Sequence, residues 1–403
     1  MRKILIYFGL IIYLFLTNSV ASSVGIRQVG TTSSIILIIF FFITLSSKRI
    51  LQIKEYFTNE ISLIFLSIII IIFQFILGNN VTNELVFSFI VPLIILFFII
   101  FENKKFKKKI QLLIIFFFFL ECTLAMYEKY NGFILFTSVS NEALETTHLE
   151  AKWLFRSNSL LGHPLENALV VSIILSFILC GEFKKTFKIF CLITGFIAFL
   201  CFNARGAILI WSGIGGFYLF QTVIDKSANI LVRSFLLIVS IVSIVGIFFL
   251  MFKTDLGGRI VNEDKILDGS ANTRLQVFAA FDFISTDDFI FGNLRNYLKV
   301  TKKLGAGGVE NSYIVYILNY GVICASFIFL YLYRIIKRYI FLYTTSNQII
   351  LFISFIVLGS FNNGLADGLT WKVFFLCISV FVRNKNENLP KKVSENIIVK
   401  LGK

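Results

Sequence analysis

Long stretches without a charged side chain are the feature of this sequence that most limits its fold. Residues 61–78, ISLIFLSIIIIIFQFILG, form one such stretch, and similar ones recur along the 403 residues. An apolar helix of about 20 residues crosses the hydrocarbon core of a bilayer, where the backbone has to satisfy its own hydrogen bonds. The mean hydropathy of +0.85 agrees with a chain that lies in a membrane.

We therefore expect an all-α polytopic membrane protein, built as one bundle of about twelve transmembrane helices. A soluble fold is disfavoured because 57% of the residues are hydrophobic and only 15% are charged, whereas soluble domains carry about 25% charged residues. The predicted spans are 4–17, 31–47, 61–78, 85–101, 110–126, 166–180, 187–202, 206–223, 234–252, 313–333, 347–361 and 369–382.

The positions of Lys and Arg predict the orientation of these spans. Cytoplasmic loops retain positive charge, and an inside N-terminus places the lysine cluster of 104–109 and the tail 383–403 on the cytoplasmic side. Both termini are then cytoplasmic in a bacterial inner membrane, and we expect residues 1–22 to stay as a helix rather than to be cleaved as a signal peptide. The net charge of +15 is spread over short turns, so nucleic acid is not an expected partner.

Metal and cofactor sites are not expected. The chain has only two histidines, and no spacing of Cys or His matches a zinc motif. No phosphate-binding loop or dinucleotide fingerprint is found either. All six cysteines fall in apolar spans, where they are interpreted as small core residues: Cys122, Cys180, Cys191, Cys201, Cys324 and Cys377.

Two connections are long enough to carry chemistry, and both are predicted to be external. They cover residues 127–165 and 253–312, whereas the other connections are short turns. Extended connections between spans are usually functional or disordered. Any reaction is therefore expected at the outer face of the membrane.

Arg205 stands between two apolar runs in FLCFNARGAILIW, almost without a loop. A cation at membrane depth is costly and usually marks a functional path. The plainer interpretation is a helix-end anchor at the interface. The functional one is a guanidinium that binds phosphate, for which its planar donors are suited.

Arg274 lies in a predicted amphipathic helix of the second long connection, residues 270–284. Its spacing of three and four residues places Val277 and Phe278 on the same face. Snorkelling of the side chain towards water is one interpretation. The other is that Arg274 points into the membrane-side cavity and binds the same phosphate group as Arg205.

Polar residues cluster again where the span 313–333 begins. Glu310 is either a helix-capping acid or a general base, and Asn311 is a candidate substrate contact beside it. Tyr313 opens a stripe with Tyr316 and Tyr320, which is more typical of an interfacial aromatic belt than of a sugar-stacking platform.

Four further residues are weaker candidates. His163 precedes a span that opens with proline, so it either contacts an acceptor or hydrogen-bonds the helix start. Glu121 is the one acid in its apolar run and is expected to pair with an arginine such as Arg205. Asp367 and Trp371 are candidate rim contacts.

Four motifs in this order resemble the O-antigen polymerase and O-antigen ligase superfamily, the Wzy-type membrane glycosyltransferases. They are GHPLENA (162–168), NARGAIL (203–209), SANTRLQVF (270–278) and GVENSYIVYILNYGVI (308–323). The resemblance covers nearly the whole chain, but each motif is loose, and its specificity comes from the ordered set.

The resemblance implies a C-type glycosyltransferase fold that handles undecaprenyl-pyrophosphate-linked saccharides at the outer face, without a metal or a nucleotide sugar. It implies pyrophosphate binding by Arg205 and Arg274, with a chain-length regulator as a further partner. The ligase branch carries a histidine where this chain has Glu310, which lowers the ligase reading. We expect a polymerase of O-antigen or capsule repeat units, with a ligase acting on lipid A core, or a lipid-linked oligosaccharide flippase, as alternatives.

Overall fold

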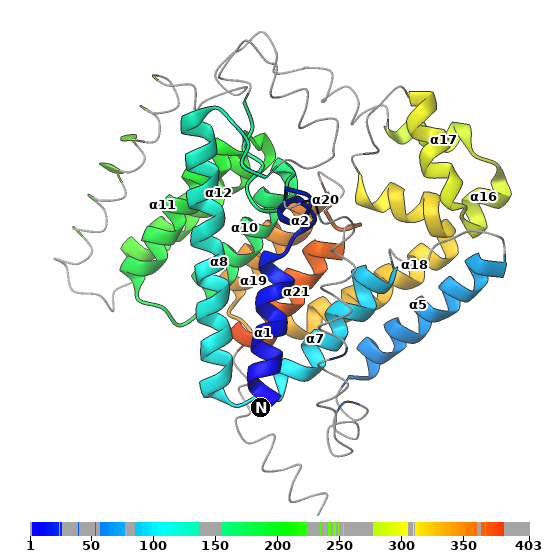
Figure 1. The fold of residues 1–403 in the computed structure, drawn as a ribbon, viewed down its shortest axis with the longest axis horizontal. Helices are drawn as coiled ribbons and strands as arrows, with labels where there is room; N and C mark the ends of the chain where they lie inside the picture. The colour runs from blue at the N-terminus through cyan, green and yellow to red at the C-terminus, as the bar shows by residue number, and fades with distance from the viewer. Residues whose placement is uncertain are drawn as a thin grey trace, which may run out of the picture.

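The computed structural model describes most of the chain. It covers residues 2–23, 57–76, 85–136, 155–224, 277–304, 311–360, 364–366 and 368–382, together with single positions at 25, 39, 53 and 309 and between 234 and 253. Every regular element in these residues is a helix, and the helices pack side by side in a bundle (Figure 1). The predicted all-α class is therefore confirmed for this part of the chain.

The helices follow the apolar runs of the sequence. Their bounds are α1 Arg2–Phe15, α2 Asn18–Ser23, α5 Thr58–Ile76, η1 Val86–Ile90, α7 Val91–Ile100, α8 Lys104–Asn131, α10 Pro164–Cys180, α11 Lys185–Cys201, α12 Arg205–Ile224, η5 Val277–Phe283, α16 Thr286–Phe291, α17 Leu294–Leu304, α18 Ser312–Ile340, α19 Thr345–Phe352, η6 Ile353–Val357, α20 Leu358–Ser360 and α21 Gly368–Phe381.

Ten of the twelve predicted spans coincide with helices, and the other two, 31–47 and 234–252, lie almost entirely outside the described residues. Length and composition fit a membrane span for three helices, α5, α8 and α18, while several other apolar helices are shorter. A membrane protein is supported by these helices, but a count of twelve spans is not.

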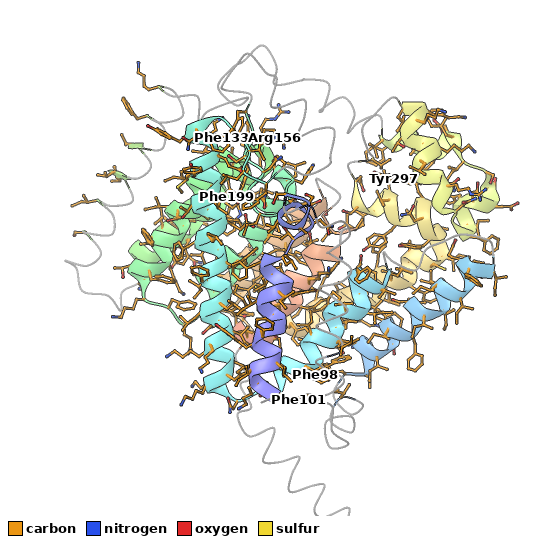
Figure 2. The ribbon with its side chains drawn as sticks, viewed as in Figure 1. Phe98, Phe101, Phe133, Arg156, Phe199 and Tyr297 are labelled. Atoms are coloured by element: carbon orange, nitrogen blue, oxygen red, sulfur yellow. The ribbon has the colours of Figure 1, made fainter. Side chains whose placement is uncertain are left out.

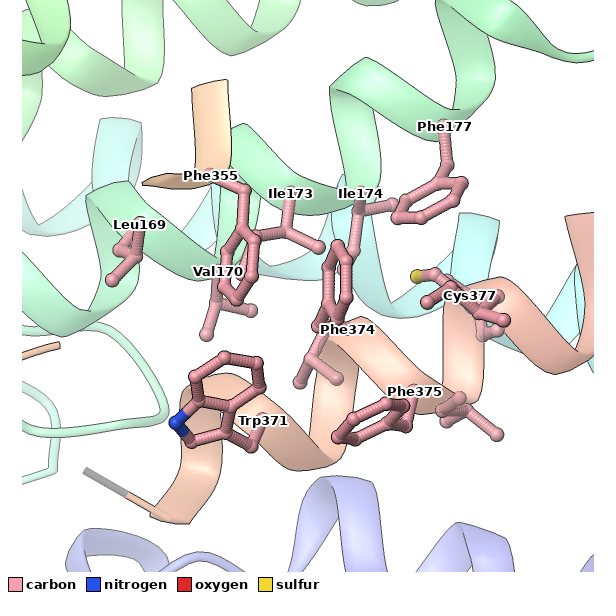
Figure 3. Close-up of a cluster of buried hydrophobic side chains, with 14 of the residues drawn as sticks. Leu169, Val170, Ile173, Ile174, Phe177, Phe355, Trp371, Phe374, Phe375 and Cys377 are labelled. Atoms are coloured by element: carbon pink, nitrogen blue, oxygen red, sulfur yellow. The ribbon is translucent and has the colours of Figure 1, made fainter. Parts of the chain in front are cut away.

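Helix α10 lies at the centre of the bundle. Each of its side chains from Asn167 to Cys180 is buried, which explains why its sequence has no polar face. Its Phe177 ring lies 5.8 Å from the Phe374 ring of α21, which in turn stacks on Phe355 of η6 at a centroid distance of 3.9 Å (Figure 3). This aromatic core fixes the helices that carry the candidate site.

Helix α18 is sharply bent at Gly321. The backbone there has φ 75° and ψ 161°, so two helices, 312–320 and 322–340, meet at this residue. The rings of Tyr313 and Phe329, eight residues to either side, are 5.2 Å apart, whereas sixteen residues of straight helix would span about 24 Å. The uninterrupted stretch that can cross a bilayer is therefore 322–340.

Helix α5 is bonded directly to this second half of α18 near its first turn. Near its last turn it is bonded to Phe291 of α16, which lies against Gly321 at the bend. Near its first turn the buried Glu60 carboxylate accepts a hydrogen bond from the Tyr339 hydroxyl at 3.0 Å and pairs with Arg338 at 3.4 Å. Near its last turn Gln74 donates to the Phe291 carbonyl at 3.2 Å. The two helices are therefore antiparallel neighbours of matching length.

An outer layer of short helices, η5, α16 and α17, lies against α18. A second, smaller apolar cluster holds η5 and α17 against residues 312–320. Val277, Val300 and Leu318 are fully buried in it, and the Asn293 amide donates to the Leu318 carbonyl at 3.1 Å. Figure 1 shows α16 and α17 beside the bent end of α18. The connection 253–312 is thus partly helical in its described residues, as predicted.

The predicted helix 270–284 is corrected in its second half. Residues 277–283 form a 3-10 helix, and 270–276 lie outside the described residues. A repeat of three residues buries Val277 and Ala280 and leaves Phe278 64% exposed. The face that an α-helix would share between Val277 and Phe278 is therefore not formed.

Candidate active site

Arg205 is the first residue of α12 and is half-buried. The carbonyl of Ala204 accepts the first bond of the helix, from the Ile208 amide at 3.0 Å, so Ala204 is the N-cap. An alanine offers no side-chain oxygen to the amides of the first turn. The positive end of the helix dipole adds to the charge of Arg205, and both favour an anion at this position.

His163 lies at the start of α10 and Pro164 opens that helix, as the sequence predicts. The His163 carbonyl accepts a hydrogen bond from the Asn167 amide at 3.1 Å. Its side chain does not cap the helix. The capping interpretation of the imidazole is therefore wrong, and its role as an acceptor contact stays a prediction.

Arg205 and His163 lie at the same end of the bundle. The Trp211 indole donates to the Ser172 hydroxyl at 2.6 Å, and this hydroxyl donates to the Ser354 carbonyl at 3.0 Å. Trp211 is six residues beyond Arg205 and Ser172 is nine beyond His163, or about 9 and 14 Å along the helices. Because the chain returns through α11 between them, α10 and α12 run in the same direction, and their starts lie within about one helical turn of the same height.

The short helix α20 contacts both the start of α12 and the start of α18. A Cβ atom on Gly206 would lie 3.9 Å from Leu358 Cδ1, and the Ser312 hydroxyl donates to the Gly359 carbonyl at 3.2 Å. The Tyr313 hydroxyl accepts from the Ser360 hydroxyl at 3.1 Å. Residues more than 100 positions apart in the sequence therefore meet around α20.

Asn311 caps α18. Its side-chain oxygen accepts hydrogen bonds from the amides of Tyr313 at 3.0 Å and Ile314 at 3.2 Å. The helix-capping role considered for Glu310 is filled by its neighbour. Arg274, Glu310 and Asp367 lie outside the described residues, so their roles stay predictions.

Two aromatic expectations are corrected. Tyr316 and Tyr320 are buried, and only Tyr313 of the tyrosine stripe is open to the surroundings. Trp371 is 2% exposed, and its indole nitrogen donates to the Leu365 carbonyl at 2.6 Å. The Tyr316 hydroxyl donates to the same carbonyl at 2.7 Å. Trp371 is therefore part of the core and not of a rim.

Sequence reasoning missed a buried segment next to these residues. Residues 155–163, called the strap below, have no helical structure, yet Ser157, Asn158 and Ser159 are at most 1% exposed. Arg156 of the strap lies at the same end of the bundle as Phe133, opposite Phe98 and Phe101 (Figure 2).

The carboxylate of Glu128 holds the strap on α8. It accepts hydrogen bonds from three backbone amides, those of Leu135 at 2.9 Å, Asn158 at 2.7 Å and Ser159 at 2.9 Å. Three such bonds offset part of the cost of burying the carboxylate. Ser159 has a φ of 46°, a left-handed conformation that these bonds maintain.

Glu121, two helical turns before Glu128 on α8, also contacts the strap. Its Oε2 accepts from the Leu160 amide at 3.4 Å, and its Oε1 has no partner among the described residues. No arginine pairs with it there, so the predicted Glu121–Arg205 pair is wrong. The sequence signal that was overlooked is the seven-residue spacing of Glu121 and Glu128, which puts two acids on one face of an apolar helix.

The strap also contacts the turn that precedes Arg205. The Ser157 amide donates to the Cys201 carbonyl at 3.1 Å, and Arg156 Nε donates to the Phe202 carbonyl at 3.4 Å. Two arginines, the starts of α10 and α12 and His163 are thereby gathered at one end of the bundle. This arrangement is suited to bind a phosphate-bearing group.

Among the described residues, no group of three or more His, Cys, Asp or Glu side chains is placed to hold a metal ion. Comparison of the chain with known protein families, with curated proteins and with solved structures gave no match in any of the three.

Proposed function

We propose that the protein is a membrane glycosyltransferase that polymerises undecaprenyl-pyrophosphate-linked repeat units of an O-antigen or capsule at the outer face of the bacterial cytoplasmic membrane. One observation carries the proposal. Gly206, which follows Arg205, contacts α20, and so do Ser312 and Tyr313, which follow Asn311. Two of the four motifs that resemble the polymerase and ligase superfamily are thus neighbours in space.

The residue types suit the reaction. The acceptor hydroxyl attacks the anomeric carbon of the donor, the bond from that carbon to the pyrophosphate oxygen breaks, and negative charge develops on the departing pyrophosphate. Cationic donors at Arg205 and Arg274 stabilise this charge in the transition state. Glu310 would take the proton of the acceptor hydroxyl, and His163 would contact the acceptor.

A defined reaction tests the proposal. Purified protein in a lipid bilayer is incubated with a lipid-linked repeat unit, and the products are separated by size. A ladder of regularly increasing length is expected. Transfer of single glycans only when lipid A core is added would identify a ligase instead, and movement of the intact donor across the bilayer without new bonds would identify a flippase.

Glu310→Gln tests the assignment of the base. The amide keeps the size of the side chain but cannot accept the proton, so polymerisation should slow by about a hundredfold or more. Initial rates are compared at equal amounts of protein in the membrane, with Asp282→Asn as a carboxylate-to-amide control in the outer layer. A rate equal to that of the unaltered protein would leave Glu310 without a catalytic role.

A further inference from the structure

We infer that Arg156 is a further pyrophosphate-binding residue, which the strap holds beside Arg205. The identity of the ligand, a pyrophosphate-linked lipid, rests on the proposed function. The placement of Arg156 does not, because it follows from contacts in the strap itself.

The guanidinium of Arg156 lies close to Arg205 in space. Its Nε is 3.4 Å from the carbonyl oxygen of Phe202, which precedes Arg205 by three residues. Three residues of chain reach at most about 11 Å. The side chains of Arg156 and Arg205 are therefore within reach of a single diphosphate group.

The backbone on both sides of Arg156 is fixed. Before it, the Phe155 carbonyl accepts a hydrogen bond from the Lys129 ammonium group at 2.9 Å. After it, the Ser157 amide donates to Cys201 at 3.1 Å and the Ser157 hydroxyl to Ala125 at 2.7 Å. A side chain mounted in this way loses little freedom when it binds an anion.

The local charge favours an anionic ligand. Lys129, Arg156 and Arg205 bring three positive charges to this end of the bundle, where the positive ends of the α10 and α12 dipoles also lie. Glu166 in the first turn of α10 adds one negative charge there. The nearby carboxylate of Glu128 is engaged by three backbone amides. A pyrophosphate carries several oxygens and is better matched by two planar guanidinium groups than by one.

The test is direct binding, independent of polymerisation. Full-length protein in nanodiscs of zwitterionic lipid is titrated with farnesyl pyrophosphate and, separately, with farnesyl monophosphate. Arg156→Gln should weaken binding of the pyrophosphate between about tenfold and a hundredfold, the range for hydrogen bonds to charged groups. Arg156→Lys keeps the charge but not the planar fork, so its loss should be smaller.

Two control variants distinguish a direct contact of Arg156 with the pyrophosphate from a purely structural role of Arg156 in the strap. Arg295→Gln removes the same charge from the exposed face of α17 and should leave the affinity unchanged. Ser157→Ala removes the hydroxyl bond to Ala125 without removing charge, and should weaken binding much less than Arg156→Gln. Equal losses in Ser157→Ala and Arg156→Gln would show that Arg156 only supports the strap.

The remaining outcomes are decisive as well. Pyrophosphate affinity that is unchanged in Arg156→Gln, or equal affinity for both probes in the unaltered protein, would overturn the inference. Binding that depends on Arg156 in a protein that forms no glycan ladder would support it and refute the polymerase proposal alone.

Discussion

Replacement of Arg205 by alanine should abolish long glycan chains while the amount of protein in the membrane stays normal. Loss of one donor to a developing anion costs about 3 kcal/mol, or roughly a hundredfold in rate. Folding should tolerate the change, because Arg205 is only half-buried at the first position of α12 and alanine is the best helix former. The measurement is chain length on a gel beside protein abundance.

Matched variants make this result specific. Arg205→Lys keeps the charge, loses the bidentate geometry and should retain part of the activity. Arg295→Ala removes an exposed arginine from the outer layer and should leave chain length unchanged. Long chains in Arg205→Ala cells would remove Arg205 from the site.

Arg274→Ala should have a similar effect, and the double variant tests whether both arginines act on one group. Residues that act as a unit have effects that do not add, so the double variant should be little worse than either single one. Losses that multiply would indicate that the two arginines act independently.

The positions of the helices could be predicted from the sequence because a long apolar run in a membrane has to form a helix to satisfy its backbone hydrogen bonds. Pro164 at the start of α10 and Asn311 before α18 are also local signals, which depend on neighbours within one helical turn.

The strap could not be predicted, because its burial depends on residues far away in the sequence. A polar segment such as 155–163 normally indicates an exposed loop, since its backbone groups need water or a partner. Here Glu128 and the carbonyls of Ala125 and Cys201 supply the partners. Arg156 was overlooked for the same reason, although Arg205 could be singled out by its apolar surroundings alone.

The tyrosine stripe shows a different limit. Spacing of three and seven residues correctly predicts one helix face, but not what covers that face. The Phe89 ring stacks on Tyr316 at a centroid distance of 6.1 Å, and the Tyr316 hydroxyl donates to the Leu365 carbonyl. The helix face that an interfacial belt would expose to water is therefore buried.

The bend of α18 is also not predictable from the sequence, since a glycine inside an apolar run is common in membrane helices. It is fixed by a contact with the outer layer. A Cβ atom on Gly321 would lie 2.5 Å from the Phe291 carbonyl carbon and 2.6 Å from the Gly292 nitrogen. Both glycines have a positive φ, 75° at Gly321 and 79° at Gly292, so each lets the other backbone approach.

Gly321→Ala should therefore destabilise the fold strongly. The left-handed conformation costs an alanine about 1–2 kcal/mol, and an overpacked contact costs about 1–3 kcal/mol more, so the free energy of unfolding should fall by about 2–5 kcal/mol. Thermal unfolding of the purified protein in detergent measures the change. Gly292→Ala should lower the free energy of unfolding in the same way, because its Cβ atom would clash with the backbone of Tyr320.

Gly216→Ala in α12 provides the matched control. This glycine lies within a helix, and its Cβ atom would have no neighbour within 4 Å, so alanine should be neutral or raise stability by up to about 1 kcal/mol. The opposite signs follow from one difference, the presence or absence of a second backbone against the glycine. If Gly321→Ala melted at the temperature of the unaltered protein, the outer layer would not fix the bend, and the contact between Gly292 and Gly321 would not hold the short helices against α18.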